Sequence, residues 1–343
     1  NMSRQYSLPD ATLGAGSVGG VSHDADFTYF ITGSAEFTAV PASGAEFLYW
    51  VGEVPAGHQL DNPLTIAAGV GRRIQPVFRT AAAATVRAWT GAAGNGLWLD
   101  AANWSPEGVP GLNDAVTMAE GLAVVTNFLS VKTLALSGTA RLFAGANIAA
   151  NSTAEVTGST HKPYVDPVIE EVAVEVGTLT LADSAGLALG GQDEDNPSRK
   201  PRFEAGSVKL SGASVLVVTA GATNATDNFE TGCGTVTVAD VFEIADTAQF
   251  VPASDQYTGG SLIVRPHKFV LGAEAMVNAE GRGFDYRQFK DPKIIAPGQG
   301  YGCDRGAGYG GKGGFAFGDY GQTYGFGYAP IHPGSCSGIY AGG

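Results

Sequence analysis

A short strand pattern returns at nearly regular intervals through the middle of this 343-residue chain. Each copy alternates apolar and small polar residues after a glycine or serine, as in residues 177–181 and 234–238. The later copies follow one another at intervals of 26 to 30 residues, with centres at Leu179, Lys209, Val236 and Leu262. Such intervals are typical of stacked repeats, in which each unit buries its inward face only against its neighbours. The pattern favours a right-handed parallel β-helix over a β-sandwich.

The composition favours strands over helices throughout the chain. It contains 50 glycines and only 15% charged residues. Glycine supplies the positive φ angles of turns, and β-branched residues suit a pleated surface. Runs of the helix formers Leu, Glu, Lys and Arg are nearly absent. We therefore expect an all-β chain.

The charge balance excludes one class of partner. There are 33 acidic against 20 basic residues, a net charge of −13, which repels nucleic-acid phosphates.

No apolar run reaches the roughly 18 residues that cross a bilayer, so we expect no membrane span. The chain begins at Asn1 rather than at methionine, which favours removal of a leader or of part of a larger precursor.

Changes in composition divide the chain into five parts. These are an extended N-terminal arm (1–25), a small β module (26–79), a linker (80–88), a parallel β-helix with a tryptophan-rich N-terminal cap (89–277) and a glycine- and aromatic-rich section (278–343).

The arm contains Gly14-x-Gly16-x-x-Gly19, which has the spacing of a dinucleotide loop. That loop works only between a buried strand and a helix, and neither is predicted here.

The β module carries a series of landmarks between Gly33 and Phe78. In order, they are an alternating strand at 37–40, Pro41 and Gly44, Phe47, Trp50-Val-Gly52, Asn62-Pro63 and Val77-Phe78. This series resembles the divergent internalin-type B repeat, a small β-grasp-like module of bacterial surface proteins. The resemblance implies a secreted multidomain protein in which such modules act as stalks or spacers.

A tryptophan-rich stretch follows the linker. Its landmarks are Trp89-Thr-Gly91, Trp98, Asn103-Trp-Ser105, Val109-Pro-Gly111 and Asp114-Ala-Val116. They resemble the opening of β-solenoid regions in autotransporter-like and other large exported bacterial proteins. Three tryptophans this close together would also suit a sugar-stacking platform. Because large aromatic side chains are usually buried, we favour a cap beneath the first coil.

The C-terminal section interleaves glycine with tyrosine and phenylalanine, and resembles glycine-rich sections inserted in β-helical exported bacterial proteins. Residues 306–313 mimic a P-loop, but Gly313 replaces the required Ser or Thr. Cys336 lies between serines and glycines as in a nucleophile elbow, with His332 nearby, but the α/β sheet behind an elbow is not predicted. We expect instead that Cys303 and Cys336 form a disulfide, which leaves Cys233 outside it.

Two segments, 159–170 and 191–203, interrupt the repeats and are predicted to be loops on one flank. Asp193, Glu194 and Asp195 have the oxygen ligands that calcium prefers. They lack the glycine-spaced aspartates of a calcium loop, so a solvated acidic turn is the favoured interpretation.

No catalytic constellation stands out in the sequence. Enzymes built on β-helices use carboxylate pairs, or calcium and a base, in a groove. The five histidines are scattered, and the acids of the coils are expected mostly at turns. We therefore expect no catalytic residue, cofactor or metal site.

The favoured function is that of a non-enzymatic extracellular or cell-surface structural protein of a bacterium, a scaffold or fibre subunit. Its expected partners are copies of itself or other surface-protein domains. Head-to-tail assembly is predicted through the arm onto an uncapped solenoid end, with the arm residues Tyr6, Leu8, Leu13, Val18 and Val21. Two alternatives stay open: a fragment of a large adhesin that binds glycans, and a β-helical polysaccharide lyase or hydrolase.

Overall fold

The computed structural model describes residues 16–19, 28–31, 34–52, 54–67, 69–80, 84–125, 127–145, 171–190, 200–221, 233–255 and 260–280. The regular elements in these ranges are strands, apart from one 3-10 helix of three residues, Ala101–Asn103. The predicted all-β class is therefore confirmed. Across the same ranges, no helix has the length and apolar character needed to span a membrane.

The N-terminal module, residues 16–80, consists of two antiparallel sheets of three strands each. One sheet has the order β1-β3-β5 and the other β2-β6-β4. The strands are β1 (Gly16–Gly19), β2 (Thr28–Ile31), β3 (Ala35–Pro41), β4 (Ala45–Gly52), β5 (Leu64–Ile66) and β6 (Gly69–Thr80). Their apolar residues, among them Phe37, Trp50 and Ile74, form a buried cluster of the module's own.

Two landmarks of the module's sequence hold it together. The indole Nε1 of Trp50 donates a hydrogen bond to the carbonyl of Asp61 at 2.7 Å, while its ring is fully buried. The Asn62 side chain bonds both backbone groups of Ala39, accepting from the amide and donating to the carbonyl, each at 2.9 Å. Because buried polar groups need partners, both residues have a structural role that explains their place in the motif.

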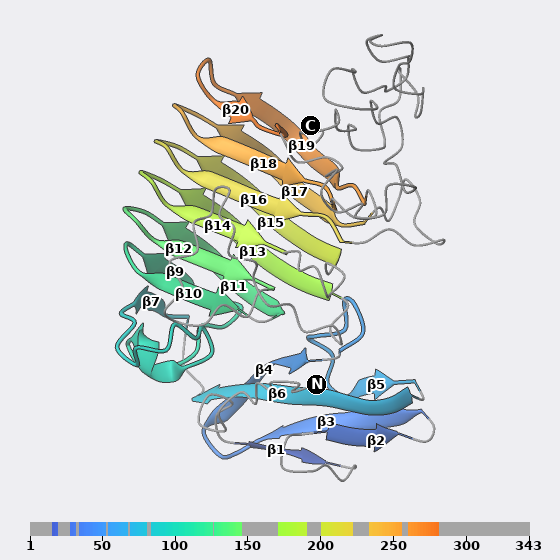
Figure 1. Cartoon of the computed structure of the whole chain (residues 1–343). Helices are drawn as coiled ribbons and strands as arrows, with labels where there is room; N and C mark the ends of the chain where they lie inside the picture. Colours follow the sequence, from blue (N-terminus) through green and yellow to red (C-terminus); the bar gives the residue numbers. More distant parts are fainter. Residues whose placement is uncertain are drawn as a thin grey trace, which may run out of the picture.

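From Val86 onward, the strands form two sheets, which we call the two-sheet stack, and from β9 (Ala115–Met118) they alternate between the two (Figure 1). The large sheet has the order β19-β17-β15-β13-β11-β9-β7-β8 and the small sheet β10-β12-β14-β16-β18-β20. The strands of the large sheet are β7 (Val86–Trp89), β8 (Trp104–Ser105), β9 (Ala115–Met118), β11 (Phe128–Leu136), β13 (Glu171–Leu181), β15 (Lys200–Leu210), β17 (Thr235–Ile244) and β19 (Ile263–Leu271). Those of the small sheet are β10 (Leu122–Val125), β12 (Arg141–Ala144), β14 (Gly186–Leu189), β16 (Val215–Thr219), β18 (Gln249–Ala253) and β20 (Met276–Val277).

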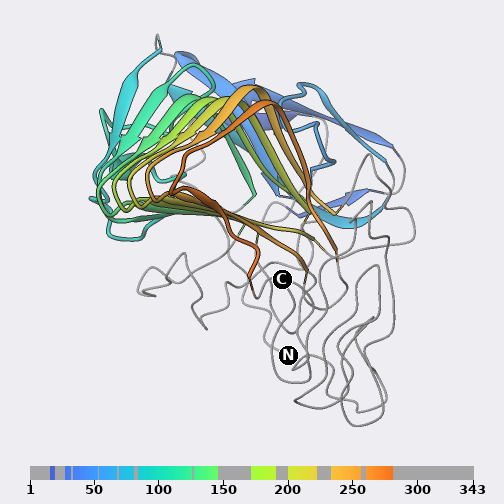
Figure 2. The same cartoon turned by 90° about the horizontal axis from the view of Figure 1, so that it is seen from above.

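Neighbouring strands of the stack run parallel, except that β7 pairs antiparallel with β8. Seen from above, the two sheets diverge from the edge at which the turns lie (Figure 2). The sheets are thus mixed, and the described residues do not close them into one tube. The described residues therefore form an all-β stack of two sheets. They do not establish the closed parallel β-helix that the repeats predict.

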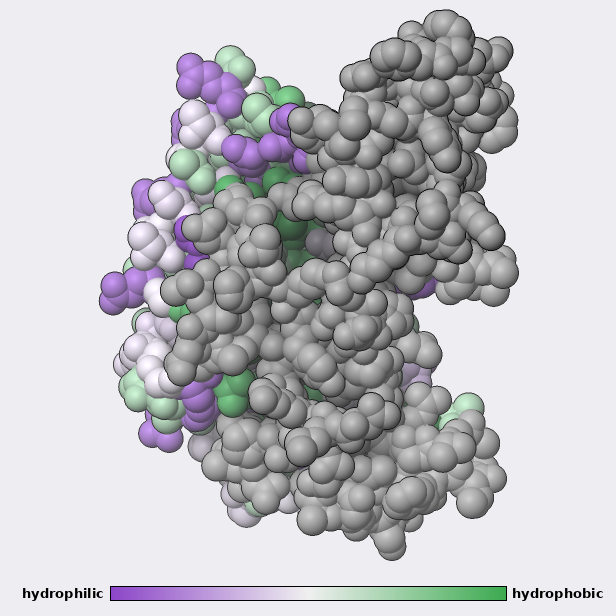
Figure 3. Space-filling view, viewed as in Figure 1, coloured by the Kyte–Doolittle hydropathy of each residue, from purple (hydrophilic) through white to green (hydrophobic). Residues whose placement is uncertain are grey.

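A column of tight turns joins each long strand to its short partner. The turns place Gly138, Asp183, Gly212 and Asp246 in the left-handed region, with φ between 53° and 64°. The Asp183 carboxylate accepts from the Gly138 amide, and the Asp246 carboxylate from the Gly212 amide, both at 2.8 Å. The predicted glycine and Asx turns are confirmed, and each aspartate ties its turn to the turn of the preceding rung. Along this edge the visible surface carries hydrophilic and weakly polar residues with single apolar ones between them (Figure 3).

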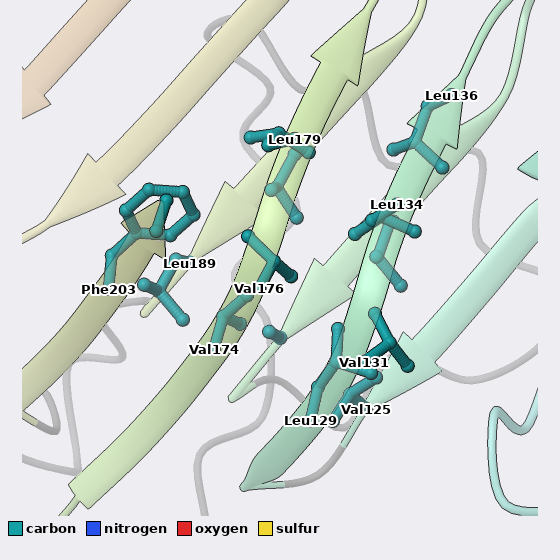
Figure 4. Packing of buried hydrophobic residues seen from close by; sticks show 14 of the residues in the cluster. Val125, Leu129, Val131, Leu134, Leu136, Val174, Val176, Leu179, Leu189 and Phe203 are labelled. Atoms are coloured by element: carbon teal, nitrogen blue, oxygen red, sulfur yellow. The ribbon is translucent and has the colours of Figure 1, made fainter. Parts of the chain in front are cut away.

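The core between the sheets consists of ladders of similar side chains (Figure 4). One ladder runs through Leu136, Leu181, Leu210 and Ile244, all at most 1% exposed. The rungs share one continuous cluster, as the repeat argument predicts.

The first rungs of the stack are closed by tryptophans. Trp98 and Trp104 are buried, their rings lie 4.6 Å apart, and Trp104 Nε1 donates to the Trp98 carbonyl at 2.8 Å. Trp89 is partly buried and contacts Trp104 edge-on at 5.0 Å. The prediction of buried tryptophans is confirmed for Trp98 and Trp104, which leaves these two rings unavailable as a sugar-stacking platform.

The predicted strand starts are wrong for two of the later rungs, whereas β17 and β19 begin at Thr235 and Ile263, close to the predicted openings. Strand β13 begins at Glu171 rather than Gly177, and β15 begins at Lys200, inside a segment predicted to be a loop. In both extensions, outward-facing charged residues alternate with inward-facing apolar residues. The charges are tolerated in strands because they pair with one another across the sheet.

Candidate functional site

A groove crosses the outer face of the large sheet where β11, β13, β15 and β17 lie side by side. It encloses about 330 Å³ and is lined chiefly by Leu112, Ser130, Glu175, Glu204 and Thr237, with backbone of the bend at Gly177 and Gly206. Ser130, Glu175, Glu204 and Thr237 occupy one register position on four successive strands. Parallel pairing therefore brings polar side chains from distant parts of the sequence into one row.

Arg202 of β15 gathers three carboxylates beside this row. Its Nε donates to Glu171 at 2.9 Å, and its Nη1 contacts Glu175 at 2.7 Å and Glu204 at 3.1 Å. Gln59 of the N-terminal module donates to the second oxygen of Glu171 at 2.9 Å. We call Glu171, Glu175, Arg202 and Glu204 the carboxylate cluster.

The carboxylate cluster carries excess negative charge. Burial by itself would lower the pKa of Arg202, but Glu171, Glu175 and Glu204 outweigh it and raise that pKa above its usual value. Arg202 is therefore a permanent cation, and it balances only one of three carboxylates. The groove is a site of negative potential on the outer face.

Several polar atoms at the groove lack a partner among the described residues. The Ser130 hydroxyl is buried without a hydrogen bond, and so is Nη2 of Arg202. Glu175 and Glu204 each use one oxygen on Arg202, and the other oxygen of each has no polar partner in the described part of the chain. Since an unpaired buried polar group is costly, the Ser130 hydroxyl marks the groove as a place for a polar ligand. The side chains of Glu175 and Glu204 are 23% and 51% exposed, so their second oxygens are accessible to such a ligand.

A second charged cluster joins the N-terminal module to the stack. Asp114 is buried, pairs with Arg79 of β6, and accepts from Arg87 Nε at 2.9 Å and from the amides of Thr85 and Gly111 at 3.0 Å each. Burial acts to raise the pKa of Asp114, but these hydrogen bonds and the charge of Arg79 lower it overall. Arg79, Arg87 and Asp114 are thus all paired within the described residues, and this network connects the module to the stack.

Apolar contacts accompany this junction. Tyr49 of the module packs edge-on against Phe128 of β11 at 5.1 Å and belongs to the core cluster of the stack. Asn127 donates to the Gly52 carbonyl at 2.9 Å. Burial raises the pKa of Tyr49, whose hydroxyl finds no partner in the described residues. Module and stack therefore share core packing.

The last described rung of the stack has apolar core positions that are exposed. Phe269, Leu271 and Val277 continue the interior ladders but are 41%, 48% and 41% exposed. Their counterparts one rung earlier, Phe242, Ile244 and Phe250, are at most 2% exposed. Within the described residues, β19 and β20 also pair on one edge only. Among the described residues, the column thus ends in partly exposed apolar side chains and in a strand edge without a paired neighbour.

The site residues named from sequence are mostly not described by the structure. Cys303 and Cys336 lie outside the described residues, as do Tyr6, Leu8, Leu13 and Val21 of the arm and the acidic triplet at 193–195. Val18 lies in β1, where it pairs with Ala39 of β3 in the same chain and packs against the module core. That strand is already engaged within its own chain. Cys233 is buried and forms no disulfide within the described ranges.

Sequence reasoning missed the carboxylate cluster and placed the acids of the coils mostly at turns. The structure corrects this, because Glu171, Glu175 and Glu204 lie within strands. The sequence contains one signal of this cluster: a glutamate lies two residues before the glycine that begins the 177–181 and the 206–210 repeat. Aligning the repeats on these glycines places Glu175 opposite Glu204. No group of three His, Cys, Asp or Glu in the described ranges is arranged to hold a metal ion.

Comparison with models of protein families, with curated proteins and with solved structures found no match to this chain.

Proposed function

We propose that the chain is a non-enzymatic structural protein of a bacterial surface or matrix, a fibre subunit that associates end to end. In this proposal the two-sheet stack is the described part of a parallel β-solenoid, and the N-terminal module is a spacer of the internalin B-repeat kind. The proposal includes export, because such modules and solenoids belong to secreted proteins.

The last described rung of the stack carries the proposal. Fully burying a Leu, Val or Phe side chain is worth about 1.5 to 3 kcal/mol, so three half-exposed ladder residues favour a further rung. Unpaired edge groups of β19 add the tendency of a free edge to recruit a strand. A strand added there would complete backbone pairing and core packing together.

The two ends of the stack differ, which determines the kind of contact. At the other end, β7 is paired on both edges and tryptophans close the core. A contact between unlike ends is heterologous, and such contacts generate open fibres when the rotation does not close. The occupant that we propose is the segment before β1 of a second copy, which includes Tyr6, Leu8 and Leu13. Val18 is excluded because β1 is used within its own chain.

Electron microscopy of the purified chain tests this proposal. We expect filaments or linear oligomers from the intact chain and monomers after deletion of residues 1–15. Leu271→Lys should also abolish assembly, because it places a charge in the exposed rung. Leu60→Lys, at a residue of the module that is 41% exposed, is the matched control and should assemble normally. Monomers under all conditions, or assembly indifferent to both changes, would contradict the proposal.

One observation favours a second candidate, a polysaccharide lyase or hydrolase. Glu175 and Glu204 occupy one register position, as the carboxylates of a groove enzyme do. Against it, Arg202 already engages both carboxylates, and no aromatic side chain among the described residues lines the groove. Turnover of any polysaccharide in a broad panel, lost in Glu204→Gln, would establish the enzyme instead.

A further inference from the structure

The groove on the outer face has an acceptor set that no part of the proposed fibre uses. Three residues with an unpaired acceptor line it: Glu175 and Glu204, each with its second carboxylate oxygen, and Ser130 with its buried hydroxyl. Among the described residues, the surrounding charge is three carboxylates against two cations, Arg202 and Lys200, of which Lys200 lies opposite Glu171 in the sheet register. A suitable ligand must therefore be a cation that donates several hydrogen bonds from one small group.

The available cations differ in how well they fit these acceptors. An ammonium group has three donors and no acceptor, which matches three acceptors and neutralises negative charge. A calcium ion takes six to eight oxygen ligands, and the described residues hold no cluster of that kind. A neutral sugar would form hydrogen bonds but would leave the charge of the carboxylates unbalanced.

The apolar wall of the groove distinguishes between carriers of an ammonium group. Leu112, which is 52% exposed, lies on the same groove as the carboxylates. A lysine side chain has an apolar four-carbon stem that packs on such a residue while its charged end reaches polar groups. An amino sugar would bring several further hydroxyl groups, for which Thr237 is the one additional side-chain hydroxyl that lines the groove in the described residues.

We infer that the groove formed by Leu112, Ser130, Glu175 and Glu204 binds a lysine side chain of a partner protein. The cavity of about 330 Å³ lies at the small end of ligand pockets, a size suited to one side chain rather than to a polymer. This inference goes beyond end-to-end assembly and does not depend on it, because the groove lies on the flank of the stack.

Binding of a small probe tests the inference on the full chain. The probe is Nα-acetyl-lysine methylamide, titrated at low salt while the backbone amide signals of Gly177 and Gly206 are followed by NMR. We expect saturable shifts at both amides. The Nε-acetylated form of the probe, which lacks the charge and two donors, should cause none.

Substitutions locate the binding at the groove. The pair Glu175→Gln and Glu204→Gln should weaken binding at least about tenfold, since hydrogen bonds to charged groups contribute about 1.5 to 3 kcal/mol each. Ser130→Ala should weaken it less. Glu243→Gln removes one carboxylate charge, as each of the two groove substitutions does, from a half-exposed position of β17 outside the groove lining and should bind like the parent chain. Circular dichroism and a melting curve confirm that each variant is folded.

Three results would overturn the inference: no saturable shift, equal binding of the acetylated probe, or binding unchanged in the double variant. Tighter binding of glucosamine than of the lysine probe would also overturn it, by assigning the groove to an amino sugar.

Discussion

At the scale of single residues, the turn column explains why particular positions carry glycine. Gly212 has a φ of 64°, and a Cβ added there would lie 2.8 Å from backbone N and O of Asp183 in the preceding rung. Asp183 and Asp246 accept the same left-handed backbone because their carboxylates bond the glycine amides of the neighbouring turns. Glycine and aspartate therefore alternate along this column of turns because each turn contacts the turn of the neighbouring rung.

We predict that Gly212→Ala lowers the free energy of unfolding by about 2 to 4 kcal/mol, from backbone strain together with steric overlap. Gly44→Ala is the control, since Gly44 has a φ of 77° but no atom within 4 Å of an added Cβ. It should cost only about 1 kcal/mol. Urea unfolding of both variants gives the comparison, and equal losses would show that the rung contact is unimportant.

Asp114 makes the junction dependent on pH. Its pKa in the folded chain lies below the ordinary value of 3.8, so the unfolded state binds its proton more readily. The stabilisation by Asp114 is therefore fully present above about pH 4 and is lost as the pH falls through the lower, folded pKa.

We predict that Asp114→Asn costs about 3 to 5 kcal/mol at neutral pH, because Arg79 and Arg87 are left buried without their counter-ion. The variant should also lose less stability than the parent chain below pH 4. Asp61→Asn, at an exposed ion pair, should cost less than about 1 kcal/mol. Thermal melts between pH 2 and 7 measure both effects. If the stability of parent and Asp114→Asn changed in parallel with pH, Asp114 would not be the source of the pH dependence.

At the scale of elements, the strands of the large sheet bend where glycines stack. A Cβ on Gly206 would lie 2.4 Å from the carbonyl oxygen of Gly177, and a Cβ on Gly177 would lie 2.5 Å from that of Lys132. Backbones of successive rungs approach closely at this line, which a larger residue does not permit. The same line forms part of the groove floor.

We predict that Gly206→Ala destabilises the chain by about 1 to 3 kcal/mol by forcing β13 and β15 apart. Ser207→Ala, at the next and partly exposed position, should stay within about 0.5 kcal/mol of the parent chain. Differential scanning calorimetry of the two variants measures whether the close backbone approach at Gly206 limits stability or whether the sheet relaxes to accommodate the added methyl group. A melting temperature for Gly206→Ala equal to that of Ser207→Ala would reject the prediction.

The elements also show which features were predictable from sequence. Repeated apolar residues, turn glycines and aspartates, and the burial of Trp98 and Trp104 follow from local patterns and general burial preferences. The carboxylate cluster does not, because Glu175 and Glu204 come together only through strand register. The segments between successive rungs differ in length, so spacing along the chain does not reveal which outward residues align.

At the scale of the whole molecule, the account describes a column with unlike ends. One end is closed by tryptophans and shares core packing with the N-terminal module, as Tyr49 and Phe128 show. The other end presents Phe269, Leu271 and Val277 to solvent. A structural subunit that grows in one direction needs this asymmetry, whereas an isolated binding domain does not.

Hydrogen exchange at the amides of β19 is the most direct measurement of the central claim, end-to-end association. We predict that the β19 amides that point away from β17 exchange fast in dilute solution and become protected as the protein concentration rises, because a strand from a second copy pairs with that edge. The amides of β13, which are in the middle of the sheet, should be protected at every concentration. Exchange at β19 that does not change with concentration, in a chain that stays monomeric, would contradict the account.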